Sequence, residues 1–175
     1  MKPEPPDLVK YFIGLLYADE AFVPKATAAL VANMGAFDYE SPEFEFGLTT
    51  YYEAEMGAPL FRRFLAIEAL MSPGELARVK LLANEIETQF AVANCRRVNL
   101  DPGYMDCNKV ILASAKYNSQ KIYLEQGIYA DPTLWYEKGR FTPYGHAFPD
   151  FKSGVYQKVF QQIRALYKAQ SKGSN

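Results

Sequence analysis

Residues 60–91, LFRRFLAIEALMSPGELARVKLLANEIETQFA, hold the signals that decide the fold. The largely apolar stretch at 60–67 predicts a strand. The Ser-Pro-Gly-Glu sequence at 72–75 then predicts a helix start, because serine caps the helix, proline suits its first turn and glutamate completes a capping box. Apolar side chains continue with helical spacing to about residue 91: Leu76, Val79, Leu82, Ala83, Ile86 and Phe90. With a further strand at 96–100, this stretch predicts a β-α-β unit.

The same pattern occurs once before in the chain. Residues 9–16 predict a strand that is apolar on both faces and therefore central, and 20–34 predict a helix. An extended segment follows at 37–46, where Pro42 favours a sheet edge or a bulge. Two such units interleave as a ferredoxin-like sandwich, with both helices on one face of the sheet. We therefore expect an α+β fold of this kind.

The second half of the chain predicts additions to this sandwich. The Asp-Pro-Gly sequence at 101–103 predicts a turn, because proline presets φ and glycine tolerates positive φ. Further strands are expected at 109–115, 120–129 and 133–136, the last two pairing as a hairpin, with a tight turn at 137–140. A final amphipathic helix, capped by Asp150 or Ser153, is expected to run to about residue 169. The sheet is thus extended by C-terminal hairpin strands and covered by a C-terminal helix.

Length and composition limit the class of protein. The chain has 175 residues and a net charge of −1, so it has no general positive field for nucleic acid or anionic membranes. Its longest apolar runs fall well short of the roughly 18–20 residues that a bilayer span needs. The polar, proline-rich residues 1–7 lack the apolar segment of a signal peptide. We expect a cytoplasmic protein with one domain at 8–169, flexible termini at 1–7 and 170–175, and no nucleic-acid or membrane partner.

Cysteine and histidine are too scarce for a structural metal site. Cys95 and Cys107 are interpreted as small buried hydrophobic residues, and His146 is the single histidine. Glu43 and Glu45 share one face of an extended segment, where a solvated strand face is favoured over a Mg²⁺ site. We expect no cofactor and no metal.

Two features suggest a binding site. Residues 49–57 place hydroxyl, phenol and carboxylate groups between two predicted strands, where functional groups often concentrate; the alternative is the first turn of a short helix. The arginine pairs at 62–63 and 96–97 put one arginine of each pair on each sheet face. An arginine beside Asn99 and Asp101 can bind a carboxylate or phosphate; the alternative is an ion pair within the protein.

A nucleotide-binding signature is incomplete. The sequences Asn108-Lys109 and Ser114-Ala115-Lys116 echo two nucleotide-base motifs of small GTP-binding proteins. Those proteins also need a phosphate loop, which this chain lacks. A nucleotide-binding protein without a phosphate loop is therefore only a third hypothesis.

The order of the segments resembles a prokaryotic family of single-domain proteins catalogued only as a domain of unknown function. The resemblance covers about residues 8–168, and its most specific parts are Tyr-Tyr-Glu-Ala-Glu-Met-Gly at 51–57 and Asn-Leu-Asp-Pro-Gly-Tyr at 99–104. It implies a compact cytoplasmic domain and supplies no substrate. Its motif-bearing polar residues are Tyr51, Tyr52, Glu53, Glu55, Arg63, Arg97, Asn99, Asp101, Tyr104 and Lys109.

The first functional hypothesis is a protein that binds a small anionic or phosphate-bearing ligand, and it leaves open whether the ligand is also converted. The expected ligand-binding residues are Tyr51, Tyr52, Arg63, Arg97, Asn99, Tyr104 and Lys109. The candidates for acid, base or cation-binding roles are Glu53, Glu55 and Asp101. The alternative is a non-catalytic interaction module that forms a homodimer through a sheet edge or the C-terminal helix.

Overall fold

The computed structural model describes residues 2–172 of the chain and shows a mixed α+β fold built on one nine-stranded antiparallel sheet. Strand β1 (Val9–Tyr17) is central and buried along its whole length. It pairs on one side with β4 (Phe61–Met71) and on the other with β5 (Val98–Met105). The short strands β2 (Phe37–Glu40) and β3 (Phe44–Glu45) pair with the outer edge of β4.

The second half of the chain continues this sheet beyond β5. Strand β6 (Lys109–Ser114) pairs with β5 and with β8 (Tyr129–Glu137). Strand β8 also pairs with β7 (Ile122–Tyr123) and with β9 (Arg140–Pro143). The strand order is therefore β2-β4-β1-β5-β6-β8-β7.

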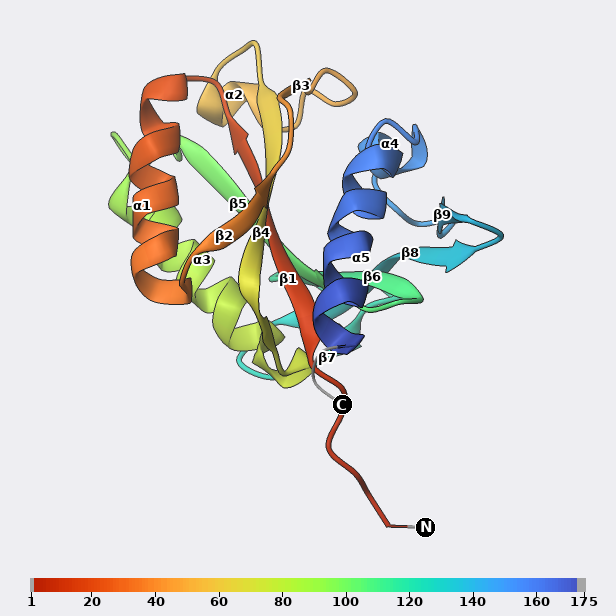
Figure 1. Ribbon diagram of the computed structural model, residues 1–175. Coiled ribbons are helices and arrows are strands. Elements are labelled where there is room, and N and C mark those ends of the chain that lie inside the picture. Colours follow the sequence, from red (N-terminus) through yellow and green to blue (C-terminus); the bar gives the residue numbers. More distant parts are fainter. Residues whose placement is uncertain (1, 173–175) are drawn as a thin grey trace.

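Helices cover both faces of the sheet (Figure 1). On one face, α1 (Val23–Met34) and α3 (Leu76–Gln89) pack on the odd-numbered residues of β1, such as Tyr11 and Ile13. On the other face, α5 (Gln157–Lys172) packs on Phe12 and on strands from both halves of the sheet. Short helices complete the set: η1 (Glu20–Phe22), α2 (Glu53–Met56), η2 (Pro73–Glu75) and α4 (Pro149–Lys152). None of the helices described is long and apolar enough to cross a membrane.

The predicted turn at 101–103 is wrong, because these residues lie within β5, which continues to Met105. The chain reverses after Met105 instead, where the Asp106 carboxylate accepts hydrogen bonds from the backbone N–H groups of Asn108 and Lys109. Proline is tolerated inside β5 because β6 joins only at Gly103, so Pro102 has a strand on one side only. Gly103 is required for close packing rather than for a turn. A Cβ there would lie 2.6 Å from the Ile111 carbonyl oxygen and 2.8 Å from the Phe12 ring.

The boundaries of other predicted elements also change. The strand expected at 120–129 is reduced to β7, and Tyr129 begins the next strand. The tight turn at 137–140 joins β8 to β9, with Lys138 and Gly139 at positive φ. The last helix extends to Lys172, beyond the expected end near 169, and residues 1 and 173–175 of the expected flexible termini lie outside the described residues. Both cysteines are free and partly exposed rather than buried.

Candidate functional site

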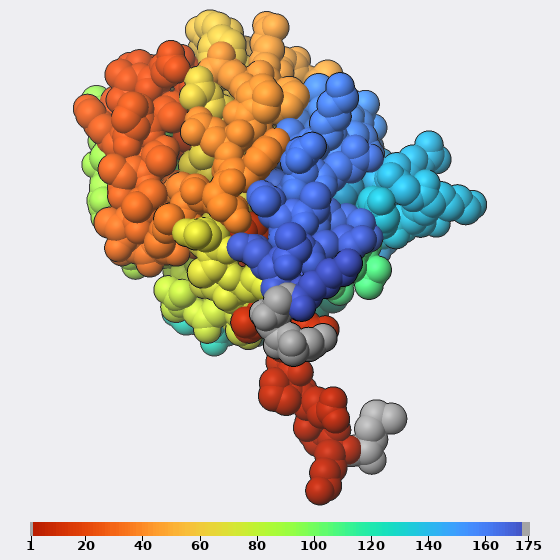
Figure 2. All heavy atoms as spheres, in the orientation of Figure 1, coloured from red at the N-terminus to blue at the C-terminus, as the bar shows by residue number. Residues whose placement is uncertain are grey.

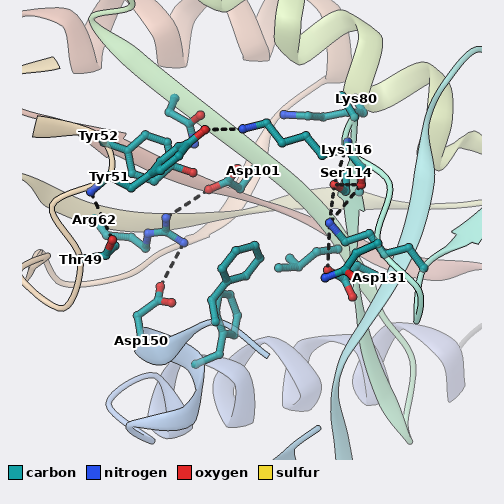
Figure 3. A pocket seen from close by; sticks show the side chains of 18 of the residues that line it. Thr49, Tyr51, Tyr52, Arg62, Lys80, Asp101, Ser114, Lys116, Asp131 and Asp150 are labelled. Atoms are coloured by element: carbon teal, nitrogen blue, oxygen red, sulfur yellow. Dashed lines mark hydrogen bonds and ion pairs between the residues drawn. The ribbon is translucent and has the colours of Figure 1, made fainter. Parts of the chain in front are cut away.

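A cavity of about 690 Å³ lies where β5 and β6 separate. The two strands pair only from Gly103–Leu112 to Met105–Val110, so residues 98–102 of β5 have β1 on one side and no paired strand on the other. The cavity is lined from both sides of this split, by the first half of β5 and by residues 112–118, which end β6 and follow it. Further lining residues come from α3, from α4, from the segment before α2 and from single positions on β4 and β8 (Figure 3).

Two side chains of α3 bond to the open edge of β5. The Lys80 ammonium donates a hydrogen bond to the Leu100 carbonyl oxygen over 2.8 Å, and the Glu87 carboxylate accepts one from the Leu100 N–H over 2.6 Å. Both side chains are buried, 3.9 Å from each other, and burial raises the pKa of Glu87. They satisfy backbone groups that a neighbouring strand would otherwise satisfy. The pair explains how a strand edge stays ordered beside a cavity.

Arg96 joins α2 to β5 at the next part of the wall. Its guanidinium donates two hydrogen bonds to the Glu55 carboxylate, over 2.8 and 2.7 Å, and a third to the Asn99 side-chain oxygen over 2.6 Å. Glu87 lies 3.5 Å away. The hydrogen bonds from Arg96 lower the pKa of Glu55 to about 2. Arg96 thus uses its hydrogen-bond donors within the protein and links α2 to β5.

Arg62 forms a second charged cluster, on β4. Its guanidinium lies 3.1 Å from the Asp101 carboxylate and 3.4 Å from that of Asp150 in α4, and it stacks at 4.8 Å over the Phe46 ring (Figure 3). Burial raises the pKa of Asp150. One buried guanidinium faces two carboxylates, so this corner of the cavity carries an excess of negative charge when both are ionised.

Lys116 and Lys121 line the opposite wall, after β6. The Lys121 ammonium donates a hydrogen bond to the Ser114 hydroxyl over 2.8 Å and lies 3.6 Å from the Asp131 carboxylate. The Lys116 ammonium reaches across the cavity to the Tyr51 hydroxyl (Figure 3), and this contact lowers the pKa of Tyr51. Within residues 2–172, no carboxylate lies within 4.0 Å of the Lys116 ammonium. This wall therefore carries an excess of positive charge.

Three buried polar atoms of lining residues have no hydrogen-bond partner in the described chain: Asn99 Nδ2, Arg62 Nε and Asp131 Oδ1. Buried polar groups in native proteins are nearly always paired. Asp131 Oδ1 lies 3.6 Å from the His146 imidazole, whereas no partner is found for Asn99 Nδ2 or Arg62 Nε in the described chain.

A family model described as a domain of unknown function, DUF4416, matches residues 7–167. The chain belongs to this family. The expected membership in an uncharacterised family is thereby confirmed, and the DUF4416 match contains every residue that lines the cavity. No curated protein and no solved structure matches the chain.

The structure brings some of the expected site residues of this DUF4416 protein together. Tyr51, Tyr52, Asn99 and Asp101 line the cavity, and Glu55 contacts it through Arg96. Glu53, on α2, is outside the lining.

The other expected residues lie elsewhere. Tyr104 and Lys109 line a second hollow of about 330 Å³, beside the β5–β6 turn and α5. Arg63 forms ion pairs with Glu20, Glu40 and Glu43 on the outer edge of β4. Arg97 lines neither hollow. No group of three or more potential metal ligands occurs among the described residues.

None of the five cationic side chains that line the cavity was among the expected site residues: Arg62, Lys80, Arg96, Lys116 and Lys121. Strand alternation contained part of the signal for Arg62, because it predicts that Arg62 and Arg63 point to opposite faces of β4. The same prediction fails for Arg96 and Arg97, which precede β5 and lie outside any strand. The sequence at 114–116 resembles a nucleotide-base motif, which by itself does not predict a cavity residue at Lys116. Lys80 and Lys121 gave no signal, since each looks like an ordinary surface lysine in its segment.

Proposed function

We propose that this DUF4416 protein binds a small organic anion in the cavity between β5 and β6. The observation that carries the proposal is the convergence of five cationic side chains with aromatic rings at one hollow. Its volume of about 690 Å³ is within the usual range of roughly 300–1,000 Å³ for small-molecule sites. The cations come from β4, α3, the segment just before β5 and the segment after β6.

The distribution of charge indicates where each part of the ligand binds. Arg62, Lys80, Arg96 and Lys121 each have a carboxylate within 4.0 Å, whereas Lys116 has none among residues 2–172. Lys116 is therefore the cation best able to attract a ligand's negative group. Tyr51, Tyr52 and Phe148 offer ring faces and edges to the organic part. Of the three carboxylates expected to act as acid or base, Asp101 is the one that lines the cavity. If the protein also converts its ligand, Asp101 is the candidate for that role.

A thermal-shift screen tests this proposal. The panel contains nucleotides, sugar phosphates, aromatic carboxylates and aromatic phosphates. A ligand at 100 times its Kd adds about 2.7 kcal/mol of stability, or roughly 5–10 °C for a chain of this length. Ala115→Trp places an indole at the cavity mouth and is expected to abolish the shift. Ala54→Trp, an exposed site on α2 outside the lining, is the matched control. A flat panel, or a shift that Ala115→Trp leaves intact, overturns the proposal.

A homodimeric interaction module is the second candidate function. Its support is an edge strand with exposed apolar side chains: Ile122 and Tyr123 in β7, next to Leu124, with Tyr117 nearby in contact with Tyr129. Exposed strand edges are ready templates for pairing with another chain. Light scattering that gives twice the chain mass, and a melting temperature that rises with protein concentration, favour this candidate; a monomer at all concentrations excludes it.

Two finer interpretations complete the proposal. The order β2-β4-β1-β5, with α1 and α3 on one face, supports a ferredoxin-like sandwich as the core of the fold. A cytoplasmic location rests on the sequence alone. A nucleotide is one member of the anion class, and its place in the screening panel tests the third hypothesis.

A further inference from the structure

Asn99 is the polar side chain of the cavity whose bonding is most clearly incomplete. It is 3 % exposed, its side-chain oxygen accepts a hydrogen bond from Arg96, and its amide nitrogen has no partner in the described chain. A guanidinium only donates, so Arg96 fixes which end of the amide faces it. The NH₂ group is directed away from Arg96, and Asn99 lines the cavity. Leaving a buried donor of this kind unpaired costs free energy, and the cavity that Asn99 lines is where an acceptor can be supplied.

Arg96 is the residue that holds Asn99 in this orientation. The two hydrogen bonds between Arg96 and Glu55 keep the guanidinium plane in place. Arg96 is therefore a positioning residue, and the free donor of Asn99 is a fixed feature of the wall.

The Lys116 ammonium supplies positive charge at the same cavity. Its side-chain partner is the Tyr51 hydroxyl, from the segment on the other side of the opening (Figure 3). Both side chains are exposed, and Tyr51 is 61 % exposed. An ammonium gains more from an anionic oxygen than from a neutral phenol, because the attraction of opposite charges adds to the hydrogen bond. The contact with Tyr51 is thus readily exchanged for a ligand.

We propose that the Asn99 amide and the Lys116 ammonium form an oxyanion subsite, which binds the carboxylate or phosphate group of the ligand while Tyr51 releases Lys116. This inference rests on the proposed function, since it places the negative group of the ligand within the cavity. When Asp101 and Asp150 are both ionised, the corner around Arg62 repels an anionic group, so the non-anionic part of the ligand faces that corner.

The decisive experiment follows the side-chain amide resonances of Asn99 in ¹H–¹⁵N spectra, assigned by their loss in Asn99→Asp. The probes are phenyl phosphate and benzoate, with phenol as the probe that lacks an oxyanion. Both anions, or one of them, are expected to shift the Asn99 resonances, whereas phenol is not. The tighter-binding anion identifies the ligand group as phosphate or carboxylate.

Affinities measured by titration calorimetry test the same subsite. Asn99→Asp keeps an oxygen for Arg96 but removes the donor, and it is expected to weaken the tighter probe by at least about tenfold. Asn84→Asp adds the same negative charge elsewhere on the cavity wall, so its effect measures the electrostatic part of the loss in affinity. Asn84→Asp is expected to weaken binding less than Asn99→Asp does.

Two exposed substitutions avoid any risk to folding. Lys116→Gln is expected to weaken the probe by about tenfold, and Tyr51→Phe to strengthen it by about twofold, because the ammonium loses its competing partner. Each outcome decides a different question. If no probe binds and the wider panel is flat, the proposed function and the subsite both fail. If a probe binds and Ala115→Trp blocks it, but Asn99 and Lys116 are insensitive, the proposed function stands and the subsite is wrong.

Discussion

Arg62 and Arg63 point to opposite faces of β4, and their surroundings differ accordingly. Arg62 lies buried at the cavity between Asp101 and Asp150, whereas Arg63 pairs with three glutamates at the outer edge of the sheet. Alternation along a strand predicts that the two arginine side chains point to opposite faces of the sheet. It does not predict which one is buried, because that depends on α4 and β5, which lie far away in the sequence. The sequence therefore predicted the kinds of side chain at the site, namely cations, aromatic rings and carboxylates, but it identified only some of the individual residues.

The Arg96–Glu55 pair leads to a prediction about pH at the residue scale. The pKa of Glu55 falls from 4.5 to about 2 in the folded protein because of Arg96. A carboxylate with a lowered pKa stabilises the fold above its unfolded pKa and loses this effect as pH falls through the folded value. Glu55→Gln is expected to cost about 1 kcal/mol at pH 7, since the pair is partly exposed. Between pH 4.5 and pH 2 this difference should disappear.

Urea unfolding of both proteins from pH 7 to pH 2.5 measures the difference. Glu53→Gln, on the same short helix, is the matched control, because no ion pair or side-chain hydrogen bond of Glu53 occurs among the described residues. Its effect should be small and constant across this range. A Glu55→Gln effect that stays the same at pH 2.5 as at pH 7 would contradict the assignment of the lowered pKa to this pair.

At the scale of elements, β5 shows why local sequence signals misled. Asp-Pro-Gly is typical of a turn, yet here it lies inside a strand. The Leu100 N–H and carbonyl both point to the open edge, and alternate residues of a strand share this direction, so the nitrogen of Pro102 also faces the split. The proline therefore costs no hydrogen bond. The β-α-β units were predictable because strong periodicity marks them, whereas the split depends on pairing between distant strands.

The support of this edge by α3 leads to a prediction at the same scale. Lys80→Met removes one of the two cations near the buried Glu87 carboxylate, leaving Arg96 at 3.5 Å, and it takes the donor from the Leu100 carbonyl oxygen. We expect this to cost about 2 kcal/mol. Adding Glu87→Gln removes the buried negative charge that has lost Lys80 and keeps an acceptor for the Leu100 N–H. The double variant should therefore be more stable than Lys80→Met by about 1 kcal/mol or more. Equilibrium unfolding of the single and double variants measures this coupling. Lys158→Met, at an exposed site on α5, should change stability by less than about 0.5 kcal/mol.

Simple additivity of Lys80→Met and Glu87→Gln would contradict a coupled pair. The conclusion would then be that Lys80 supports β5 through its bond to the Leu100 carbonyl alone.

At the scale of the whole molecule, α5 holds the two parts of the sheet together. Strands β5 and β6 share only a short register, so the sheet alone joins β2–β5 to β6–β9 weakly. The helix packs on residues from both parts within one apolar cluster. Figure 2 shows α5 lying along this face between the first half of the chain and the β8–β9 hairpin. A cavity at the split is compatible with a stable fold because the connection runs through α5 and not across the opening.

Phe160 is the residue of α5 that best tests this role of the helix. It is fully buried, and its ring centroid lies 5.3 Å from that of Phe12 on β1 and 5.9 Å from that of Phe141 on β9. Phe160→Ala is expected to cost about 3–5 kcal/mol. Hydrogen exchange should show the same loss of protection for Ile13 in β1 and Val110 in β6, since one residue supports both parts. The exposed Phe148 gives the control, because Phe148→Ala removes the same atoms without opening the core. Loss of protection confined to β6–β9 would mean that the two parts open separately and that α5 belongs to only one of them.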